Sequence, residues 1–226
     1  MIKSISLVLP AKNEEKNIKK TIITCRGLLK KKKIPFEIIV VVNNSTDSTA
    51  EIVKKMAKKM PELLLIEEKK AVLKGGAVEL GFNRAKYDCV GFIDSDNTFT
   101  TPSILKVLNA FDKEDVSAVL AKKTYRSIKR KILSNGLGLL TQMLFGLKNT
   151  QTGLKLFKRK DVLAAFPLKE KGWIFDLEIL WKMKKKGKKI IYVPIVLRKS
   201  SEGGFSNGDV AKMLAGLIRI RFRKFN

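Results

Sequence analysis

The sequence predicts an α/β fold, a Rossmann-like domain in which a mostly parallel central sheet is flanked by helices. Two short runs near the N-terminus, Ile5–Leu9 and Phe36–Val42, are almost entirely apolar. Strands of this kind are buried on both faces of a parallel sheet. The segment 13–33 between them has apolar residues at helical spacing, namely Ile18, Ile22, Cys25 and Leu29. A strand, a helix and a second strand in this order favour a parallel pair joined by a right-handed crossover.

The same alternation of apolar runs and helical patterns continues along the chain. Further strands are expected at Leu63–Ile66, Cys89–Ile93, Ser117–Ala121, Leu154–Phe157 and Lys189–Leu197. Further helices are expected at Asp47–Met60, Gly75–Lys86, Ser127–Leu147, Ile174–Lys186 and over the tail from Gly208. A chain of 226 residues has the size of one domain. We therefore expect one domain over residues 1–207 and a basic amphipathic helix over 208–226.

The composition restricts the chemistry that the chain can carry out. It has 47 Lys and Arg residues against 21 Asp and Glu residues, a net charge of +26, which favours a polyanionic partner. It contains no histidine, so Ser-His-Asp triads, Cys-His pairs and histidine zinc sites are excluded. The two cysteines, Cys25 and Cys89, form no CxxC pattern and indicate neither a disulfide framework nor a zinc knuckle. A reducing cytoplasm fits this cysteine usage best.

The apolar segments are shorter than a membrane span. The run near Met1 leads directly into polar sequence and is expected to be a strand, not a signal peptide. The longest nearly uncharged stretch, Gly136–Leu147, has about a dozen residues, fewer than the ~18–20 that cross a bilayer. The helix expected at Ser127–Leu147 is basic at its start and apolar after it. It is either an interfacial helix, held to anionic lipid by both features, or an ordinary core helix.

An Asp-Ser-Asp motif, Asp94 to Asp96, directly follows the apolar run Cys89–Ile93. Two carboxylates one residue apart at a strand end can hold one divalent cation, and such a cation can bridge a diphosphate. The same residues could also form a polar turn in which an aspartate caps a helix. The motif alone does not decide between these two interpretations.

Three further polar loops are expected at the same edge of the sheet. Residues 10–15 (PAKNEE) end the first strand, and residues 43–49 (NNSTDST) end the second strand and open a helix. Residues 74–77 (KGGA) open the third helix. Ligands bind beyond the carboxyl ends of the strands in such sheets, and helix N-termini favour anions. Each loop alone could be a turn with a helix cap, but together they indicate a site for a phosphorylated ligand.

The chain resembles family-2 glycosyltransferases with the GT-A fold. Four segments that follow one another in the same order carry this resemblance: PAKNEE, NNSTDST, KGGAVELGFNRA and FIDSD. The second half, through NTQTGLKLFKRKDV, GWIFDLEIL and VPIVLRKSSEGGFS, is most similar to the polyprenyl-phosphate (dolichyl-phosphate) glucosyl- and mannosyltransferases. The resemblance extends over residues 5–206. It implies that a hexose is transferred with inversion from a nucleotide-diphosphate sugar, of the UDP-glucose or GDP-mannose type, to a polyprenyl phosphate.

The resemblance also implies which residues hold the donor. The nucleoside and its phosphates are expected to contact residues of the polar loops, which are Pro10, Ala11, Asn13, Glu14, Asn44, Asp47, Lys74 and Ser95. Asp94 and Asp96 are expected to hold Mg²⁺ or Mn²⁺ against the diphosphate, where the metal neutralises charge on the leaving group. The family usually has acidic residues where this chain has Asn43, Asn44 and Asn149, so the preferred nucleotide base stays open.

The acceptor decides whether a general base is needed. A lipid-linked phosphate is already an anion and can attack without proton removal, whereas a sugar hydroxyl cannot. Basic side chains would then position the phosphate, and the resemblance suggests Arg130, Arg198, Lys122, Lys123 and Lys199. For a hydroxyl acceptor the base candidates are Asp176 and Glu178. Alternatively, these two are helix N-terminal carboxylates beside a buried Trp173 and Phe175.

Several partners and alternatives follow. We expect a cytoplasmic protein that associates peripherally with the inner, anionic face of the membrane, and a membrane subunit is a further candidate partner. A basic nucleic-acid-binding protein is the non-enzyme alternative, since the net charge suits phosphate neutralisation. Nucleic acid is nevertheless not the expected partner, because the lysine charge is spread over helices without an aromatic-basic RNA motif. A nucleotidyltransferase would have a glycine-rich phosphate loop where this chain has PAKNEE. A glycosyltransferase acting on a hydroxyl of a soluble glycan remains an alternative.

Overall fold

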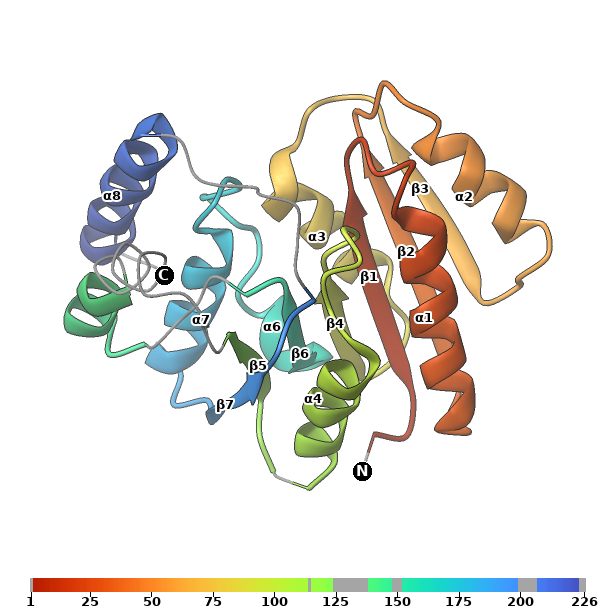
Figure 1. The fold of residues 1–226 in the computed structure, drawn as a ribbon. Helices are drawn as coiled ribbons and strands as arrows, with labels where there is room; N and C mark the ends of the chain where they lie inside the picture. Colours follow the sequence, from red (N-terminus) through yellow and green to blue (C-terminus); the bar gives the residue numbers. More distant parts are fainter. Residues whose placement is uncertain (1, 114, 124–137, 148–151, 199–206, 224–226) are drawn as a thin grey trace.

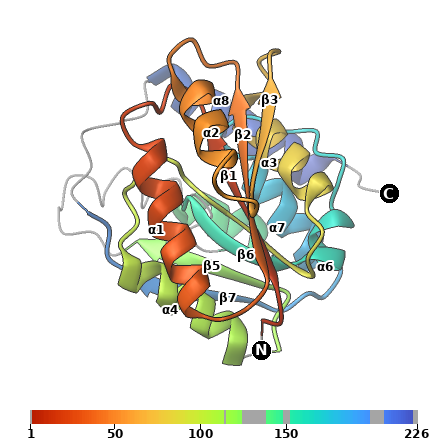
Figure 2. The ribbon, with the colours of Figure 1, turned by 90° about the vertical axis from the view of Figure 1, so that its right-hand side faces the viewer.

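Seven strands form one sheet, with helices on both of its faces (Figures 1 and 2). The structure is a computed structural model, and it describes residues 2–113, 115–123, 138–147, 152–198 and 207–223. The strand order is β3-β2-β1-β4-β6-β5-β7. The predicted α/β fold with a mostly parallel sheet is therefore confirmed.

The strands are β1 (Ile5–Ala11), β2 (Phe36–Asn43), β3 (Leu63–Glu68), β4 (Cys89–Ile93), β5 (Ala118–Lys123), β6 (Leu154–Lys158) and β7 (Ile190–Ile195). The helices are α1 (Ile18–Lys31), α2 (Thr49–Ala57), α3 (Leu73–Arg84), α4 (Thr101–Lys113), α6 (Arg159–Leu163), α7 (Phe175–Lys185) and α8 (Asn207–Phe222). A further short helix covers residues 138–145. Each predicted strand lies within two residues of its observed bounds at both ends.

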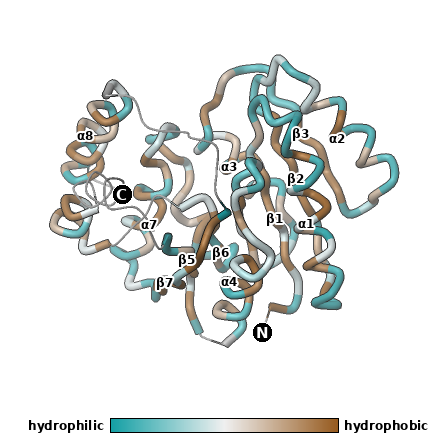
Figure 3. The backbone as a smooth tube through the Cα atoms, in the orientation of Figure 1, coloured by the Kyte–Doolittle hydropathy of each residue, from teal (hydrophilic) through white to brown (hydrophobic). Residues whose placement is uncertain are grey.

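Two apolar cores, one on each face of the sheet, hold the layers together. Successive strand residues point to opposite faces, so Leu7 and Leu9 of β1 enter one core and Val8 enters the other. Helices α1, α2 and α4 cover the first face, and α3, α6, α7 and α8 cover the second. Hydrophobic residues are concentrated along the central strands, whereas helices such as α2 alternate between hydrophobic and hydrophilic residues (Figure 3). The uniformly apolar runs in the sequence reflect burial from both sides.

One strand runs against the others, which the periodicity of the sequence does not predict. β1, β2, β3 and β4 pair in parallel, and so do β5 and β7, but β6 is antiparallel to both β4 and β5. The register pairs Ile93 with Leu154, so the beginning of β6 lies at the carboxyl end of β4. This places residues just before β6 beside the Asp-Ser-Asp motif.

Several helix predictions need correction. α1 begins at Ile18 rather than at 13, because residues 13–15 bond to the loop after β2. α4 and α6 were not predicted, although Ile104, Val107 and Leu108 of α4 are buried at helical spacing. Of the helix expected at Ser127–Leu147, only residues 138–147 lie in the described part of the chain.

The C-terminal helix α8 is part of the second core. Met213, Leu217 and Ile220 are buried, and Cα of Gly216 lies so close to Ile174 that a Cβ would be 2.1 Å from Cδ1 of Ile174. Leu214 and Ile218 of the same helix are 39 and 59% exposed, so its apolar residues lie partly in this core and partly at the surface. Among the described residues, no helix is both long enough and apolar enough to cross a membrane.

Candidate functional site

The loops after β1, β2 and β4 each contain an asparagine in the left-handed backbone conformation. The φ angles are 54° at Asn13, 49° at Asn44 and 57° at Asn97. Asparagine tolerates this conformation better than other residues with a side chain, apart from aspartate. The three residues follow the carboxyl ends of β1, β2 and β4, which end at the same edge of the sheet. The loops that contain them therefore meet at this edge (Figure 1).

Hydrogen bonds join the loop after β1 to the loop after β2. The Oδ1 atom of Asn13 accepts the Thr46 N–H at 2.9 Å, and the Thr49 hydroxyl accepts the Glu14 N–H at 2.8 Å. Asp47 accepts the Glu15 N–H at 3.0 Å and the Thr49 N–H at 3.0 Å. These bonds bring three of the predicted donor-binding residues, Asn13, Glu14 and Asp47, together. Asn44 begins the same loop after β2, and its N–H donates to the Glu68 carbonyl at 2.7 Å.

Pro10, Ala11 and Ser95 lie beneath that surface rather than on it. Pro10 and Ala11 are the last residues of β1 and pair with Val41 and Val42 of β2. Ser95 is 2% exposed and donates its hydroxyl to the Pro10 carbonyl at 2.9 Å, while its own carbonyl accepts the Thr21 hydroxyl. Ser95 therefore fixes the Asp-Ser-Asp loop to the end of β1.

Asp94 is held from two sides. Its N–H donates to the Gly153 carbonyl at 2.8 Å, and its Oδ1 atom lies 2.5 Å from Nζ of Lys74. The Oδ2 atom packs against Gly153 so closely that a Cβ on this glycine would be 1.8 Å away. Only glycine at position 153 leaves room for the Asp94 carboxylate in this position.

Lys74 projects from a rigid turn at the start of α3. Leu73 has a φ of 58°, and the Gly75 N–H donates to the Lys171 carbonyl at 2.8 Å. A Cβ on Gly75 would lie 2.5 Å from Cβ of Phe175, which explains the glycine there. The buried Asn43 stabilises the same turn, because its Oδ1 atom accepts the Val72 N–H at 3.1 Å. Asn43 thus has a structural contact in addition to its place near the predicted nucleoside site.

Asp96 is exposed and forms a tight turn, in which its Oδ1 atom accepts the Thr98 N–H at 3.0 Å. Arg198 reaches the same turn from the segment after β7. Its Nη1 atom donates to the Asn97 carbonyl at 2.8 Å, and its N–H donates to the Thr98 carbonyl at 2.9 Å. The structure therefore brings Arg198 next to the acidic motif, while Lys122 and Lys123 end β5. Arg130, Asn149 and Lys199 lie outside the described residues.

Asp176 forms a buried ion pair with Lys155 of β6. The Nζ atom of Lys155 lies 2.8 Å from Oδ2 of Asp176, also donates to the Thr152 carbonyl, and lies 5.1 Å from the centre of the Phe92 ring. The Lys155 side chain is 0% exposed, and burial lowers its pKa more than the Asp176 carboxylate raises it. In the Lys74 ammonium, burial acts to lower the pKa, but Asp94, Asp176 and Asp96 together raise it. The two pairs form one charge network.

Glu178 and Trp173 differ from their predicted surroundings. The Glu178 carboxylate is fully buried and accepts the N–H groups of Lys169 and Glu170, at 3.0 and 2.6 Å, and pairs with Lys182 at 2.7 Å. These bonds fix the loop before α7, so Glu178 has a structural role and is not placed as a base. Trp173 is 51% exposed rather than buried, and it donates from Nε1 to Asp209 of α8.

The acidic residues at this edge repel one another. Burial raises the pKa of Glu14, and the carboxylates of Asp96, Asp94 and Asp47 raise it further against the effect of Asn17. In the described part of the chain, no three acidic or cysteine side chains converge to enclose a metal ion. Mg²⁺ is commonly held by one or two carboxylates together with substrate phosphates, an arrangement that Asp94 and Asp96 fit. A divalent cation there would also relieve the repulsion.

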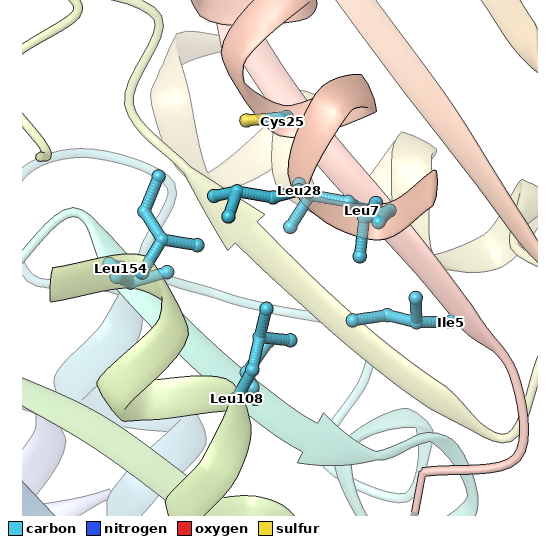
Figure 4. Close-up of a pocket in the computed structure, with 9 residues that line it drawn as sticks. Ile5, Leu7, Cys25, Leu28, Leu108 and Leu154 are labelled. Atoms are coloured by element: carbon cyan, nitrogen blue, oxygen red, sulfur yellow. The ribbon is translucent and has the colours of Figure 1, made fainter. Parts of the chain in front are cut away.

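Two small cavities contribute little to this site. One is a small void between α1, α4, β1 and β6, lined by apolar side chains such as Ile5, Cys25 and Leu108 (Figure 4). Another lies under the acidic loop and is bordered by Thr21, Asp94 and Asn97. Neither has the size of a nucleotide sugar, so the loops themselves form the candidate surface.

Two residues of the site were missed from the sequence. Gly153 and Lys155 belong to the stretch TGLKLF, where the glycine and a lysine within an apolar run were the available signals. A lysine at a buried strand position requires a buried carboxylate, and an apolar strand with one cation could have indicated such a pair.

The chain resembles known proteins over most of its length. Residues 6–162 match the model of Glycosyl transferase family 2. The dolichyl-phosphate beta-glucosyltransferase of Saccharomyces cerevisiae is 34% identical over 173 residues, which cover 66% of this chain and 51% of the yeast protein. That of Dictyostelium discoideum is 32% identical over 170 residues, with the same coverage of both chains. The chain thus spans about half the length of these two relatives.

Solved structures show the same fold. Glucosyl-3-phosphoglycerate synthase of Mycobacterium tuberculosis, in complex with Mn²⁺, UDP and phosphoglyceric acid, superimposes with a TM-score of 0.73 at 23% identity. The match covers 96% of this chain and 77% of the mycobacterial chain. A complex with Mn²⁺, UDP-glucose and phosphoglyceric acid gives a TM-score of 0.72 at 20% identity, over 99% and 81% of the two chains. These neighbours have the GT-A fold, which confirms that prediction.

Proposed function

The chain belongs to glycosyl transferase family 2, and we propose that it transfers glucose from UDP-glucose to a polyprenyl phosphate of the dolichyl phosphate type. One observation supports this proposal above all. The acidic pair Asp94 and Asp96 lies at the carboxyl end of β4, between Lys74 and Arg198 and next to the joined loops after β1 and β2. In this arrangement, a metal ion and the diphosphate of a donor could bind at the acidic pair, and the nucleoside could bind at the adjacent loops.

The donor is proposed from the relatives and from the composition of the loops. The relatives in yeast and Dictyostelium are named beta-glucosyltransferases, and the mycobacterial structures contain UDP or UDP-glucose, so UDP-glucose is favoured over GDP-mannose. Asn13, Glu14, Asn44 and Asp47 would contact the nucleoside. An asparagine such as Asn44 can both donate to and accept from a base, which keeps recognition possible without the usual acidic pair.

Asp94 and Asp96 would hold Mg²⁺ or Mn²⁺, and the metal would neutralise the charge that develops on the departing nucleoside diphosphate. An oxygen of the acceptor phosphate would form the new bond to the anomeric carbon from the face opposite the diphosphate. The bond between that carbon and the diphosphate oxygen would break, so the configuration inverts. Arg198 would orient the acceptor phosphate, with Arg130 as a second candidate.

This reaction requires no general base. The second pKa of a phosphate monoester is about 6, so the acceptor carries nearly two negative charges at neutral pH. Asp176 supports this view, because its carboxylate is buried and paired with Lys155 at 2.8 Å. A hydroxyl acceptor would need a carboxylate that is free to take a proton. Transfer to a soluble glycan is the alternative that this pairing disfavours.

The proposal is tested with Asp94→Asn and Asp96→Asn. We expect both variants to lose transfer to polyprenyl phosphate and to bind UDP with Mn²⁺ at least about tenfold more weakly, as measured by isothermal titration. Asp88→Asn is the matched control, because Asp88 is exposed and precedes the opposite end of β4. Unchanged UDP binding and turnover in both site variants would refute the metal assignment.

We further propose that the protein acts on the inner, anionic face of the membrane. Leu214, Ile218 and Phe222 form an exposed apolar stripe on α8, with exposed fractions of 39, 59 and 79%. The helix at 138–145 exposes Leu139 and Met143 by 59 and 74%. Apolar side chains together with a net charge of +26 suit the surface of anionic lipid.

Sedimentation with anionic vesicles at low salt tests this second proposal. Replacing Leu214, Ile218 and Phe222 by serine should release the chain from the vesicles, because it removes the exposed apolar stripe. The fold should persist, since none of the three is buried in the core. Higher salt should weaken binding by the unchanged chain, because ions screen the basic residues. Binding that is absent at every salt concentration would refute the proposal.

A further inference from the structure

The ammonium group of Lys74 occupies the side of Asp94 where a metal ion would need to bind. Nζ of Lys74 lies 2.5 Å from Oδ1 of Asp94, and the other carboxylate oxygen, Oδ2, packs against Gly153. Oδ1 is therefore the atom for which both cations would compete. We propose that Lys74 is an exchangeable counter-ion, which neutralises Asp94 until a divalent cation displaces it. The displaced lysine then pairs with a phosphate of the bound donor.

The exchange is confined to side chains, because both backbones are fixed. The Asp94 N–H donates to Gly153 at 2.8 Å, and the Gly75 N–H donates to Lys171 at 2.8 Å. A Cβ on Gly75 would lie 2.5 Å from Cβ of Phe175, so the turn that carries Lys74 has no room to shift. The Lys74 side chain is 38% exposed and has a flexible stem, so its ammonium can turn toward solvent or ligand.

Charge explains why the two cations exclude each other. A metal bound to a carboxylate oxygen lies about 2.0–2.6 Å from it, so a metal and an ammonium on the same oxygen would repel strongly. The other charges around Lys74 do not replace Asp94. Asp176 is already paired with the buried Lys155, and Asp96 accepts bonds from Thr98. After displacement, the diphosphate of the donor is the anion available to the Lys74 ammonium.

The exchange makes metal binding depend on the donor. Without donor, the metal must break the Lys74–Asp94 pair, and the released ammonium has no diphosphate to pair with. With donor present, the released ammonium meets a diphosphate, so metal and donor strengthen each other's binding by the same factor. This inference rests on the proposed function, since it requires a metal at Asp94 and a diphosphate beside it.

The test measures Mn²⁺ binding with and without UDP, by titration and by electron paramagnetic resonance of free Mn²⁺. We expect Lys74→Met to bind Mn²⁺ alone about tenfold more tightly than the unchanged chain, because the competing cation is gone. The factor by which UDP strengthens Mn²⁺ binding should fall by about tenfold. Lys171→Met is the matched control: its ammonium pairs with Glu79 at 3.6 Å, so its loss removes a nearby charge without releasing Asp94.

Two results would overturn the inference, and they differ from a failure of the proposed function. Weaker or unchanged binding of Mn²⁺ alone to Lys74→Met, with a normal melting temperature, would show that Lys74 does not compete for Asp94. An equal increase in Mn²⁺ affinity in Lys74→Met and Lys171→Met would show that the lower positive charge near the site, and not the release of Asp94, causes the effect. Lys74→Gln also removes the ammonium group, so it should bind Mn²⁺ in the same way as Lys74→Met. If the unchanged chain and Lys74→Met both fail to bind Mn²⁺ with UDP, the metal site itself is refuted.

Discussion

Replacing Lys155 by methionine should strongly destabilise the fold, because it leaves a buried carboxylate without its partner. The Lys155 side chain is 0% exposed and that of Asp176 is 7% exposed, with 2.8 Å between Nζ and Oδ2. Removing one member of a buried ion pair costs about 3–5 kcal/mol, since the remaining charge stays out of water. Methionine nearly preserves the volume of the lysine stem, so a cavity adds little. We expect a loss of about this size in the free energy of unfolding.

Urea denaturation followed by circular dichroism measures this loss, and a second substitution tests its cause. If the unpaired Asp176 is responsible, Lys155→Met combined with Asp176→Leu should recover most of the stability, because no charge then remains buried. The control is Lys158→Met. Lys158 lies three residues further along β6 and pairs at 2.5 Å with Asp115, whose side chain is 93% exposed. This exposed pair should contribute little, because water and salt screen it.

The outcome separates two explanations of the buried pair. If Lys155→Met lowers stability no more than Lys158→Met, the charge of Lys155 is not needed to compensate Asp176. If the double variant is as unstable as the single variant, lost packing rather than an unpaired charge is the cause. Either result would refute the reasoning and would reopen Asp176 as a titratable group available to a substrate.

Further predictions concern the site and the attachment of α8. Gly153→Ala should weaken Mn²⁺-dependent UDP binding by about tenfold or more, because a Cβ would meet Oδ2 of Asp94 at 1.8 Å; binding equal to that of the unchanged chain would contradict this. Arg198→Ala should raise the KM for polyprenyl phosphate while UDP binding changes little. Asp176→Asn should lower stability, because it leaves Lys155 without its buried partner, but should retain substantial turnover per folded molecule; complete loss with the fold intact would indicate a general base. Bonds from Arg219 chiefly lower the pKa of Glu170 below its ordinary value of 4.5, so its contribution to stability should be complete above pH 4.5 and lost as the pH falls through the lowered pKa. Glu170→Gln should remove this part of the acid dependence in urea denaturation.

The sequence predicts the strands well because each strand is buried from both sides. Phe36–Asn43 lies between two layers of helices, so its central residues, Ile38 to Val42, are apolar whichever face they point to. Its carboxyl end is equally clear, since Asn43 and Asn44 begin a polar stretch. The gathering of Asn13, Asp47 and Asp94 at one edge follows from the parallel order of β1, β2 and β4.

What the sequence does not predict depends on contacts between distant segments. The helix expected over residues 13–33 begins only at Ile18, because Glu14 and Glu15 bond to Thr49 and Asp47 instead of forming a first helical turn. Glu178 has the residue type and position of a base candidate, yet backbone N–H groups of Lys169 and Glu170 occupy its oxygens. The direction of β6 is likewise absent from the periodicity, since parallel and antiparallel strands can both be apolar throughout.

The antiparallel direction of β6 explains why two charge pairs meet at this edge of the sheet. Because Ile93 pairs with Leu154, Gly153 precedes β6 opposite Asp94, and Lys155 lies opposite Phe92 inside the sheet. A parallel strand in the same place would bring its other end to Asp94. Lys155 then pairs with Asp176 at the start of α7. Phe175, the residue before Asp176, packs against Gly75, and Gly75 directly follows Lys74. The position of the Lys74 ammonium thus depends on β6 through Asp94 and on α7 through Gly75. A change in β6 should therefore alter metal binding even where it touches neither Asp94 nor Lys74.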